Sequence, residues 1–191
     1  MLAKIFSGTT IGLDGVLIEV EVDVANRGFP TFTIVGLPDK AVDEAKERVR
    51  AAIINAGFSM PESRITVNLA PADIPKIGSG FDLPIAIGIL AASGKIKTDL
   101  LKYSLFLGEL SLKGELREVP GALSIALIAK NKKINNIFFS PLNAFESSIV
   151  ENTLIYPSKN LTEIIFHLNQ LKQLTPQPYF EIEKIINEEK Y

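Results

Sequence analysis

The residues best suited to chemistry lie in one polar turn, Gly78-Ser79-Gly80, followed by Asp82 at the start of an apolar segment. Backbone amides of a glycine-rich turn in front of a helix can bind an anion such as a nucleotide phosphate. A carboxylate in the first helical turn would repel that anion, whereas Ser79 and Asp82 have the spacing of a capping box that binds the helix's own amides. We therefore predict a structural cap, with an anion site and a serine nucleophile as alternatives.

A serine nucleophile needs a base within hydrogen-bond reach. Lys76 and Lys113 are the remote lysines that could serve Ser79, although no spacing in the sequence brings either one to it. Lys76 lies in the loop before the apolar segment, where we expect a solvated side chain. Both lysines are also candidate contacts for nucleic acid or for another subunit.

The most basic cluster consists of Lys130, Lys132 and Lys133, at the end of a helix predicted over 120–133. Such a cluster can mark a nucleic-acid edge, but cations at a helix C-terminus also stabilise the helix dipole by about 0.3 to 1 kcal/mol without any partner. The sequence favours dipole stabilisation and keeps nucleic-acid contact as the alternative.

Two further side chains have simple structural interpretations. Arg48 follows Glu44 by one helical turn, the favourable order for a surface ion pair. His167 lies among apolar residues and is the only histidine in a chain without cysteine, so no second histidine or thiolate can share a metal with it. We predict a helix-surface or hydrogen-bonded core histidine.

Composition excludes several classes of protein. The chain has 191 residues, of which 47% are hydrophobic, which suits one well-buried core. It carries 20 basic and 22 acidic residues, so no overall basic field points to nucleic acid. Zinc fingers and disulfide scaffolds are excluded by the lack of cysteine. Since no apolar run approaches the roughly 20 residues of a membrane span, and no signal-peptide core is present, we expect a cytoplasmic protein without a membrane partner.

Hydrophobic periodicity supplies the elements that position these residues. Strands are expected at 16–24, 32–35, 64–69, 105–107, 137–139 and 154–156, with a hairpin over 110–116. The first two of these strands are expected to pair with each other. Helices are expected at 39–56, 81–92, 120–133, 143–150 and 161–174. The pattern predicts an α+β fold of two layers, in which helices cover a mixed sheet. We expect one domain over 1–172 and a linker over 173–191.

The segment Pro75 to Asp82, together with Gly108 to Leu116, resembles the proteolytic domain of Lon. That resemblance implies a Lon-protease-like fold, also called the ribosomal protein S5 domain 2-like fold. It places the serine nucleophile of Lon on Gly80 and its lysine base on Leu123. Glycine has no hydroxyl group and leucine cannot accept a proton, so the resemblance implies the fold without the peptidase dyad.

Three segments carry a closer match, namely Gly28 to Asp39, Arg48 to Ile53, and Val67 to Asp73 continued by Asp82 to Ala86. They closely resemble the N-terminal region of the ComM family, also called YifB or magnesium-chelatase-like ATPases. The resemblance covers essentially 1–171. It implies a noncatalytic Lon-like domain, a linker and an AAA+ ATPase module in a hexameric DNA helicase that drives branch migration during natural transformation.

The sequence departs from this family pattern at one point. It contains no Gly-x-x-x-x-Gly-Lys-Ser/Thr phosphate loop, so the ATP and magnesium implied for the complete protein are not expected to bind here. We expect a noncatalytic domain that docks subunits in a homo-oligomeric ring and that contacts DNA as a further option. A serine peptidase, a nucleotide or anion binder, and a magnesium-chelatase accessory are the alternatives.

Overall fold

The structure is a computed structural model that describes residues 1–181. Its strands are β1 (Leu2–Ile11), β2 (Asp14–Val24), β3 (Thr31–Val35), β4 (Arg64–Ala70), β5 (Ser104–Phe106), β6 (Glu109–Leu110), β7 (Leu116–Arg117), β8 (Asn136–Phe139) and β9 (Leu154–Pro157). Its helices are α1 (Lys40–Asp43), α2 (Ala45–Asn55), α3 (Asp82–Ala92), α4 (Ala122–Asn131), α5 (Pro141–Ser147) and α6 (Leu161–Leu168), with a short 3-10 turn at Leu101–Tyr103. The predicted mixture of strands and helices is confirmed.

The main sheet is mixed and has seven strands in the order β3-β4-β2-β1-β5-β8-β9, while β6 and β7 form a separate hairpin. The prediction that β2 and β3 pair is wrong, because β4 lies between them, antiparallel to β2 and parallel to β3. The reason is the helical crossover from β3 through α1 and α2, which returns the chain parallel to β3. Strand β1, at the centre of the sheet, was not predicted from the sequence.

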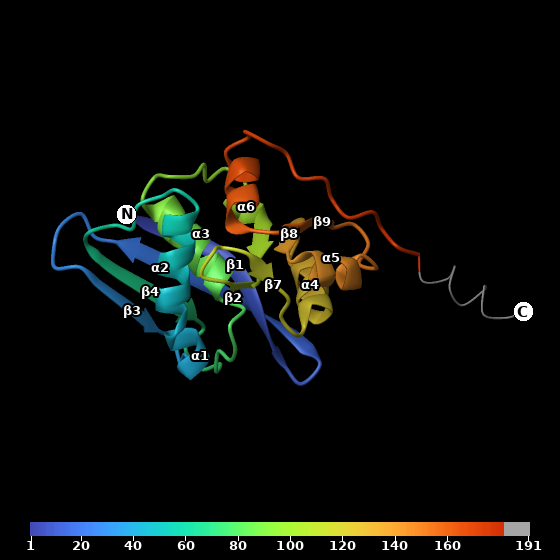
Figure 1. The fold of residues 1–191 in the computed structure, drawn as a ribbon. Helices are drawn as coiled ribbons and strands as arrows, with labels where there is room; N and C mark the ends of the chain where they lie inside the picture. Colours follow the sequence, from blue (N-terminus) through green and yellow to red (C-terminus); the bar gives the residue numbers. More distant parts are fainter. Residues whose placement is uncertain (182–191) are drawn as a thin grey trace, which may run out of the picture.

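Helices cover the two faces of the sheet unequally. One hydrophobic cluster joins α2, α3 and α6 to one face, and a second joins α4 and α5 to the other. Alternate residues of one strand serve both clusters: in β5, Leu105 packs in the second and Phe106 in the first. The predicted two layers therefore become three where α4 and α5 lie (Figure 1). Around β4 and the start of β1, the uncovered face carries polar pairs such as Lys4 with Glu19.

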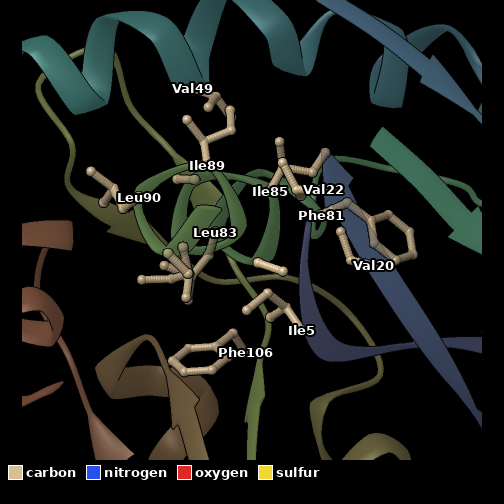
Figure 2. Close-up of a cluster of buried hydrophobic side chains, with 14 of the residues drawn as sticks. Ile5, Val20, Val22, Val49, Phe81, Leu83, Ile85, Ile89, Leu90 and Phe106 are labelled. Carbon is tan, nitrogen blue, oxygen red and sulfur yellow. The ribbon is translucent and has the colours of Figure 1, made fainter. Parts of the chain in front are cut away.

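Helix α3 lies at the centre of the first cluster, and all of its residues are buried. Figure 2 shows it between Val49 of α2, Val20 and Val22 of β2, and Phe106 of β5. Gly88 permits this close approach, because a Cβ atom there would lie 2.4 Å from Cγ2 of Val22. The turn before α3, which carries the polar residues singled out above, is therefore held on a rigid support.

Several helix boundaries differ from the prediction. The helix expected at 39–56 is divided at Glu44 into α1 and α2. Helix α5 spans Pro141–Ser147 rather than 143–150, because Ser140 caps it and Pro141 suits a first helical turn.

Helix α4 begins at Ala122 rather than at Pro120, because its N-cap residue Gly121 lies in a turn and has a left-handed φ of 82° that a helical residue does not adopt. Helix α6 ends at Leu168 rather than at residue 174, since Gln170 adopts a φ of 60° and turns the chain. None of the helices in the described residues has the length and apolarity needed to cross a membrane.

Part of the segment predicted as a linker contacts the domain. The Gln177 amide donates to the Ile155 carbonyl of β9 at 2.7 Å, and the Phe180 amide donates to the Ser148 carbonyl at 3.0 Å. The chain up to these residues thus runs along the β9 side of the molecule. The remainder of the predicted linker, 182–191, lies outside the described residues.

Candidate functional site

The turn that contains Gly78 is fastened to the start of α1. Asp39 accepts a hydrogen bond from the Val42 amide at 2.8 Å and so caps α1, while its other oxygen accepts from the Gly78 amide at 3.0 Å. A backbone bridge between Pro38 and Lys76 runs beside this contact. The Gly78 amide, which an anion would need, is therefore already bound to a carboxylate, and a phosphate would meet like charge at Asp39.

The predicted capping box at α3 is wrong. The N-cap residue of α3 is Phe81, which makes no side-chain cap. The Ser79 hydroxyl donates instead to the Glu109 carboxylate. The Asp82 carboxylate accepts from Nε of Arg48 at 2.6 Å, from Nη2 of Arg48 at 3.0 Å and from the Leu110 amide at 3.1 Å. Both side chains bind distant elements, because charged donors and acceptors form stronger hydrogen bonds than a local amide.

Arg48 likewise binds a partner other than the predicted one. Its Nη2 donates to the Ala41 carbonyl at 2.9 Å as well as to Asp82, and no ion pair joins it to Glu44 within the described part of the chain. Glu44 pairs with Lys40 at 3.8 Å instead. The packing of α2 on α3 aims the guanidinium at the buried carboxylate, where a planar two-bond contact is possible.

The pKa values of Asp82 and Glu109 are shifted in opposite directions. Burial raises the pKa of Asp82 to about 6, against the opposing effect of Arg48. The hydrogen bond from Ser79, and then the contact from Arg117 at 3.0 Å, hold the pKa of Glu109 below its ordinary value. A carboxylate with a lowered pKa is a poor base, so the Ser79 and Glu109 pair is suited to holding the turn rather than to activating a nucleophile.

A cavity of about 250 Å³ opens beside this turn. It is lined by Gly8, Thr9, Thr10, Ile77, Gly78, Ser79, Gly80, Phe81, Leu107, Val119, Pro120 and Ile125. No charged side chain lines it in the described part of the molecule. Of the two positions that the Lon resemblance pairs, Gly80 lies in the cavity wall, 3.0 Å from Cδ1 of Leu107 measured from its would-be Cβ atom, whereas Leu123 packs against the second hydrophobic cluster.

The expectation of a solvated Lys76 is wrong. Its side chain is fully buried, and its ammonium group donates to the Pro71 carbonyl. Burial lowers its pKa. The backbone bridge fixes the loop on both sides, since the Lys76 amide donates to Leu37 at 3.1 Å and the Lys76 carbonyl accepts from Asp39 at 3.0 Å. This buried ammonium group has no surface from which to contact DNA or a subunit, and it does not bind Ser79.

The remaining predicted lysines lie away from the turn. Lys113 is exposed in the loop of the β6–β7 hairpin, beside a separate hollow that Glu163 also lines. Lys132 and Lys133 are exposed after the end of α4, and Lys130 is half-buried in its last turn. The fold therefore does not bring Lys76, Lys113 and the Lys130 cluster together on one surface.

His167 is a hydrogen-bonded core residue, as predicted. Its Nδ1 atom accepts from the Leu174 amide at 3.0 Å, and its ring packs against Phe138 and Tyr156. Burial lowers its pKa, so the neutral ring is favoured. The described residues contain no group of three or more histidine, cysteine, aspartate or glutamate side chains that could hold a metal ion.

Sequence alone indicates neither Arg117 nor the partners of Glu109 in this network. Glu109 belongs to the Gly108 to Leu116 segment, where its default role is a structural one at a strand edge, and its bonds to Ser79 and Arg117 agree with that role. A signal for them existed, because Glu109 and Arg117 lie directly opposite each other in the β6–β7 hairpin, where opposite charges attract. The hairpin register would have had to be known to use it.

Comparison with known proteins gives consistent similarities. The family described as "Subunit ChlI of Mg-chelatase" matches residues 20–143, which include the whole network. The chain is 45% identical over 173 residues to "Competence protein ComM" of Haemophilus influenzae, covering 91% of this chain and 34% of that protein. It is 48% identical over 125 residues to "Uncharacterized protein YifB" of Escherichia coli, covering 65% and 24%. It is also 44% identical over 149 residues to the YifB protein of Salmonella typhimurium, covering 78% and 29%. The chain thus spans about a third or less of the length of these relatives.

Proposed function

This chain belongs to the ComM and YifB family of magnesium-chelatase-like proteins, and on that premise we propose that it is a noncatalytic organising domain of a ComM-like DNA motor. Its task would be to hold subunits in register in a homo-oligomeric ring, with hydrolysis of ATP, and any strand movement in recombination, left to residues outside this sequence. The domain would perform this role within a larger assembly in the bacterial cytoplasm.

One observation carries the proposal: the polar groups at the Gly78 turn form hydrogen bonds that join one structural element to another. Asp39 binds Gly78, Ser79 binds Glu109, and Asp82 binds Arg48. Groups so engaged stabilise a rigid support and are unavailable to a substrate. The uncharged cavity beside them also offers neither a base nor a cation for a phosphate.

The first test is self-association of the purified chain. Sedimentation velocity from micromolar to millimolar protein should give a weight-average mass that rises reversibly with concentration. A mass that stays at 20.9 kDa over the whole range would contradict the assembly role. Titration with ATP in a calorimeter and treatment with a fluorophosphonate probe complete the test, and we expect neither heat of binding nor labelling of Ser79.

Contact with DNA is a second candidate role, favoured by the lysines after α4. Lys132 and Lys133 are exposed, and none of the ion pairs found among residues 1–181 involves them or Lys130. Unpaired cations can release counterions from a phosphate backbone.

This second role is tested by fluorescence anisotropy with single-stranded and four-way-branched DNA over a salt series. Three phosphate contacts would give a slope of about −2 to −3 in log affinity against log salt. Reversing Lys130, Lys132 and Lys133 to glutamate should abolish that binding. Reversing Lys95, Lys97 and Lys102, which are also exposed, is the control with the same change in charge. Equal loss from both triple variants would assign binding to net charge alone.

A further inference from the structure

The cavity beside Gly78 has an open strand edge as one wall. Strand β1 is parallel to β5 with one registered pair, Phe6 with Leu105, and β5 ends at Phe106. Residues 8–10 of β1 therefore run past the end of β5 and line the cavity. The Val24 amide donates to the Met1 carbonyl, and the N-terminal amine of Met1 donates to the Val24 carbonyl. By the antiparallel alternation, the amide and carbonyl groups of Gly8 and Thr10 therefore point away from β2. An edge of this kind can bind the backbone of an incoming extended segment.

The chemistry of the cavity selects a neutral, apolar side chain. Its walls are apolar side chains and hydroxyl groups, and the exposed Ile77 stands at its rim. A charged group would lose its hydration there without meeting an opposite charge. A volume of about 250 Å³ is ample for one aromatic ring, because a cavity of about 150 Å³ already holds benzene.

The same chain carries a matching projection. Phe29 is 90% exposed in the loop that joins β2 to β3, between Gly28, which has a φ of 129°, and Pro30. At this exposure the ring makes little contact with its own domain and is available to a cavity on another molecule. This loop lies at the far end of the sheet from the tip of the β1–β2 hairpin (Figure 1), so Phe29 cannot reach the cavity that β1 lines in its own domain.

Charges around the two features are complementary. Arg27 is exposed two residues before Phe29, and Glu118 is exposed directly before Val119 of the cavity wall. If an extended loop inserts the ring into the cavity, the guanidinium and the carboxylate both lie at the rim, where they can steer encounter and fix the register.

We propose that the cavity beside Gly78 receives Phe29 from a second copy of this chain. The inference rests on the assembly role proposed above and names the interface. Because the donor loop and the acceptor cavity are different surfaces, one such contact leaves a free loop on one copy and a free cavity on the other. Its repetition in one direction gives a closed ring or an open filament, and its reciprocal use by two copies gives a two-fold dimer. An anchor ring in a water-excluding pocket is also the usual form of a binding hot spot.

Disulfide crosslinking tests the contact directly, because the chain contains no cysteine. Phe29→Cys and Ile77→Cys are made in separate chains, both at exposed positions, and mixed under mild oxidation. We expect a mixed dimer to form at least about tenfold faster than from the control mixture of Leu13→Cys with Ile77→Cys, since Leu13 is 91% exposed but lies at the hairpin tip. Equal rates for the two mixtures would overturn the inference.

Self-association of Phe29→Ala and of Leu13→Ala distinguishes the proposed interface from the assembly role. Phe29→Ala should raise the dissociation constant about tenfold or more, and Leu13→Ala should leave it within about twofold. A wild-type chain that associates, with no effect of Phe29→Ala and no preferred crosslink, overturns this interface but leaves the assembly role intact. A wild-type chain that remains monomeric overturns both.

Discussion

Helices α3 and α5 begin with the same polar pattern, a serine followed three residues later by a carboxyl or amide side chain. At α5, the Ser140 hydroxyl accepts from the Asn143 amide at 3.3 Å, which is a local cap. At α3, Ser79 and Asp82 leave their own helix and bind Glu109 and Arg48. Identical spacing thus gives a cap at one helix and a tertiary network at the other.

The neighbours explain the difference. Asn143 is neutral and fits the uncharged backbone beside it, accepting from the Val119 amide and donating to the Val119 carbonyl, each at 2.9 Å. Asp82 is charged and fully buried, so it needs a cation, and α2 supplies Arg48. A capping pattern therefore fixes a helix start locally only when no packed neighbour offers a stronger partner.

The largest difference between the two helix starts is expected from Arg48→Met. It leaves the Asp82 carboxylate buried without its cation, and we expect a loss of about 3 to 5 kcal/mol in the free energy of unfolding. Urea unfolding at pH 7 measures it. Lys46→Met, which removes the surface pair of Lys46 with Asp43, is the control and should cost about 0.5 kcal/mol or less. A loss below about 1 kcal/mol for Arg48→Met, the value of two such surface pairs, would show that Asp82 is stabilised mainly by other groups.

The contribution of the α3 network to the free energy of unfolding should depend on pH, with an effect of intermediate size, whereas that of the α5 cap should not. The pKa of Asp82 rises from 3.8 to about 6 on folding, so the folded state binds this proton more tightly. The resulting stabilisation is complete below about pH 4 and disappears as the pH rises through 6, a change of about 3 kcal/mol. Asp82→Asn should remove this component from unfolding curves taken between pH 4.5 and 8.

Ser140→Ala provides the comparison for that pH series, because no titratable group takes part in the α5 cap. Its destabilisation should be the same at every pH. If the difference in stability between wild type and Asp82→Asn is also flat across the range, the raised pKa of Asp82 is wrong.

The smallest expected effects come from the two serines. Ser140→Ala removes a helix cap and Ser79→Ala removes one half-buried hydrogen bond to a carboxylate, and each should cost about 1 kcal/mol. Amide hydrogen exchange distinguishes their roles more sharply than stability. Faster exchange should appear in the first turn of α5 for Ser140→Ala, and the first turn of α3 should be unchanged for Ser79→Ala. Equally faster exchange in the first turns of both helices would show that Ser79 does cap α3.

Periodic patterns predicted most of the elements. The alternation in 16–24 gave β2, whose Ile18, Val20 and Val22 are buried, and the spacing of Val49 and Ala52 gave the buried face of α2. Such patterns predict their elements well because each depends only on which face of one strand or helix is buried. They did not give β1 or the pairing of β3 with β4, because pairing depends on how a distant crossover packs.

The sequence predicted where the site lies, but it did not predict which residues its side chains contact. The turn at Gly78 was identified from its residue types, and Gly80 does lie in the wall of a cavity. Lys76 was expected in solvent and is buried, since the bridge to Pro38 could not be read from spacing. Glu109 and Arg117 entered the network only through the hairpin register.

The sequence determined the periods of the strands and helices other than β1, because backbone geometry imposes a period of 2 or 3.6 residues locally. It also carries the family match and contains no phosphate loop. The tertiary structure alone decided which partner each polar side chain binds. Ser79, Asp82 and Arg48 each had a plausible local partner, and each binds a residue 28 or more positions away along the chain. The physical reason is that burial removes water as a competitor, so charged groups bind whichever opposite charge the packed elements bring within reach.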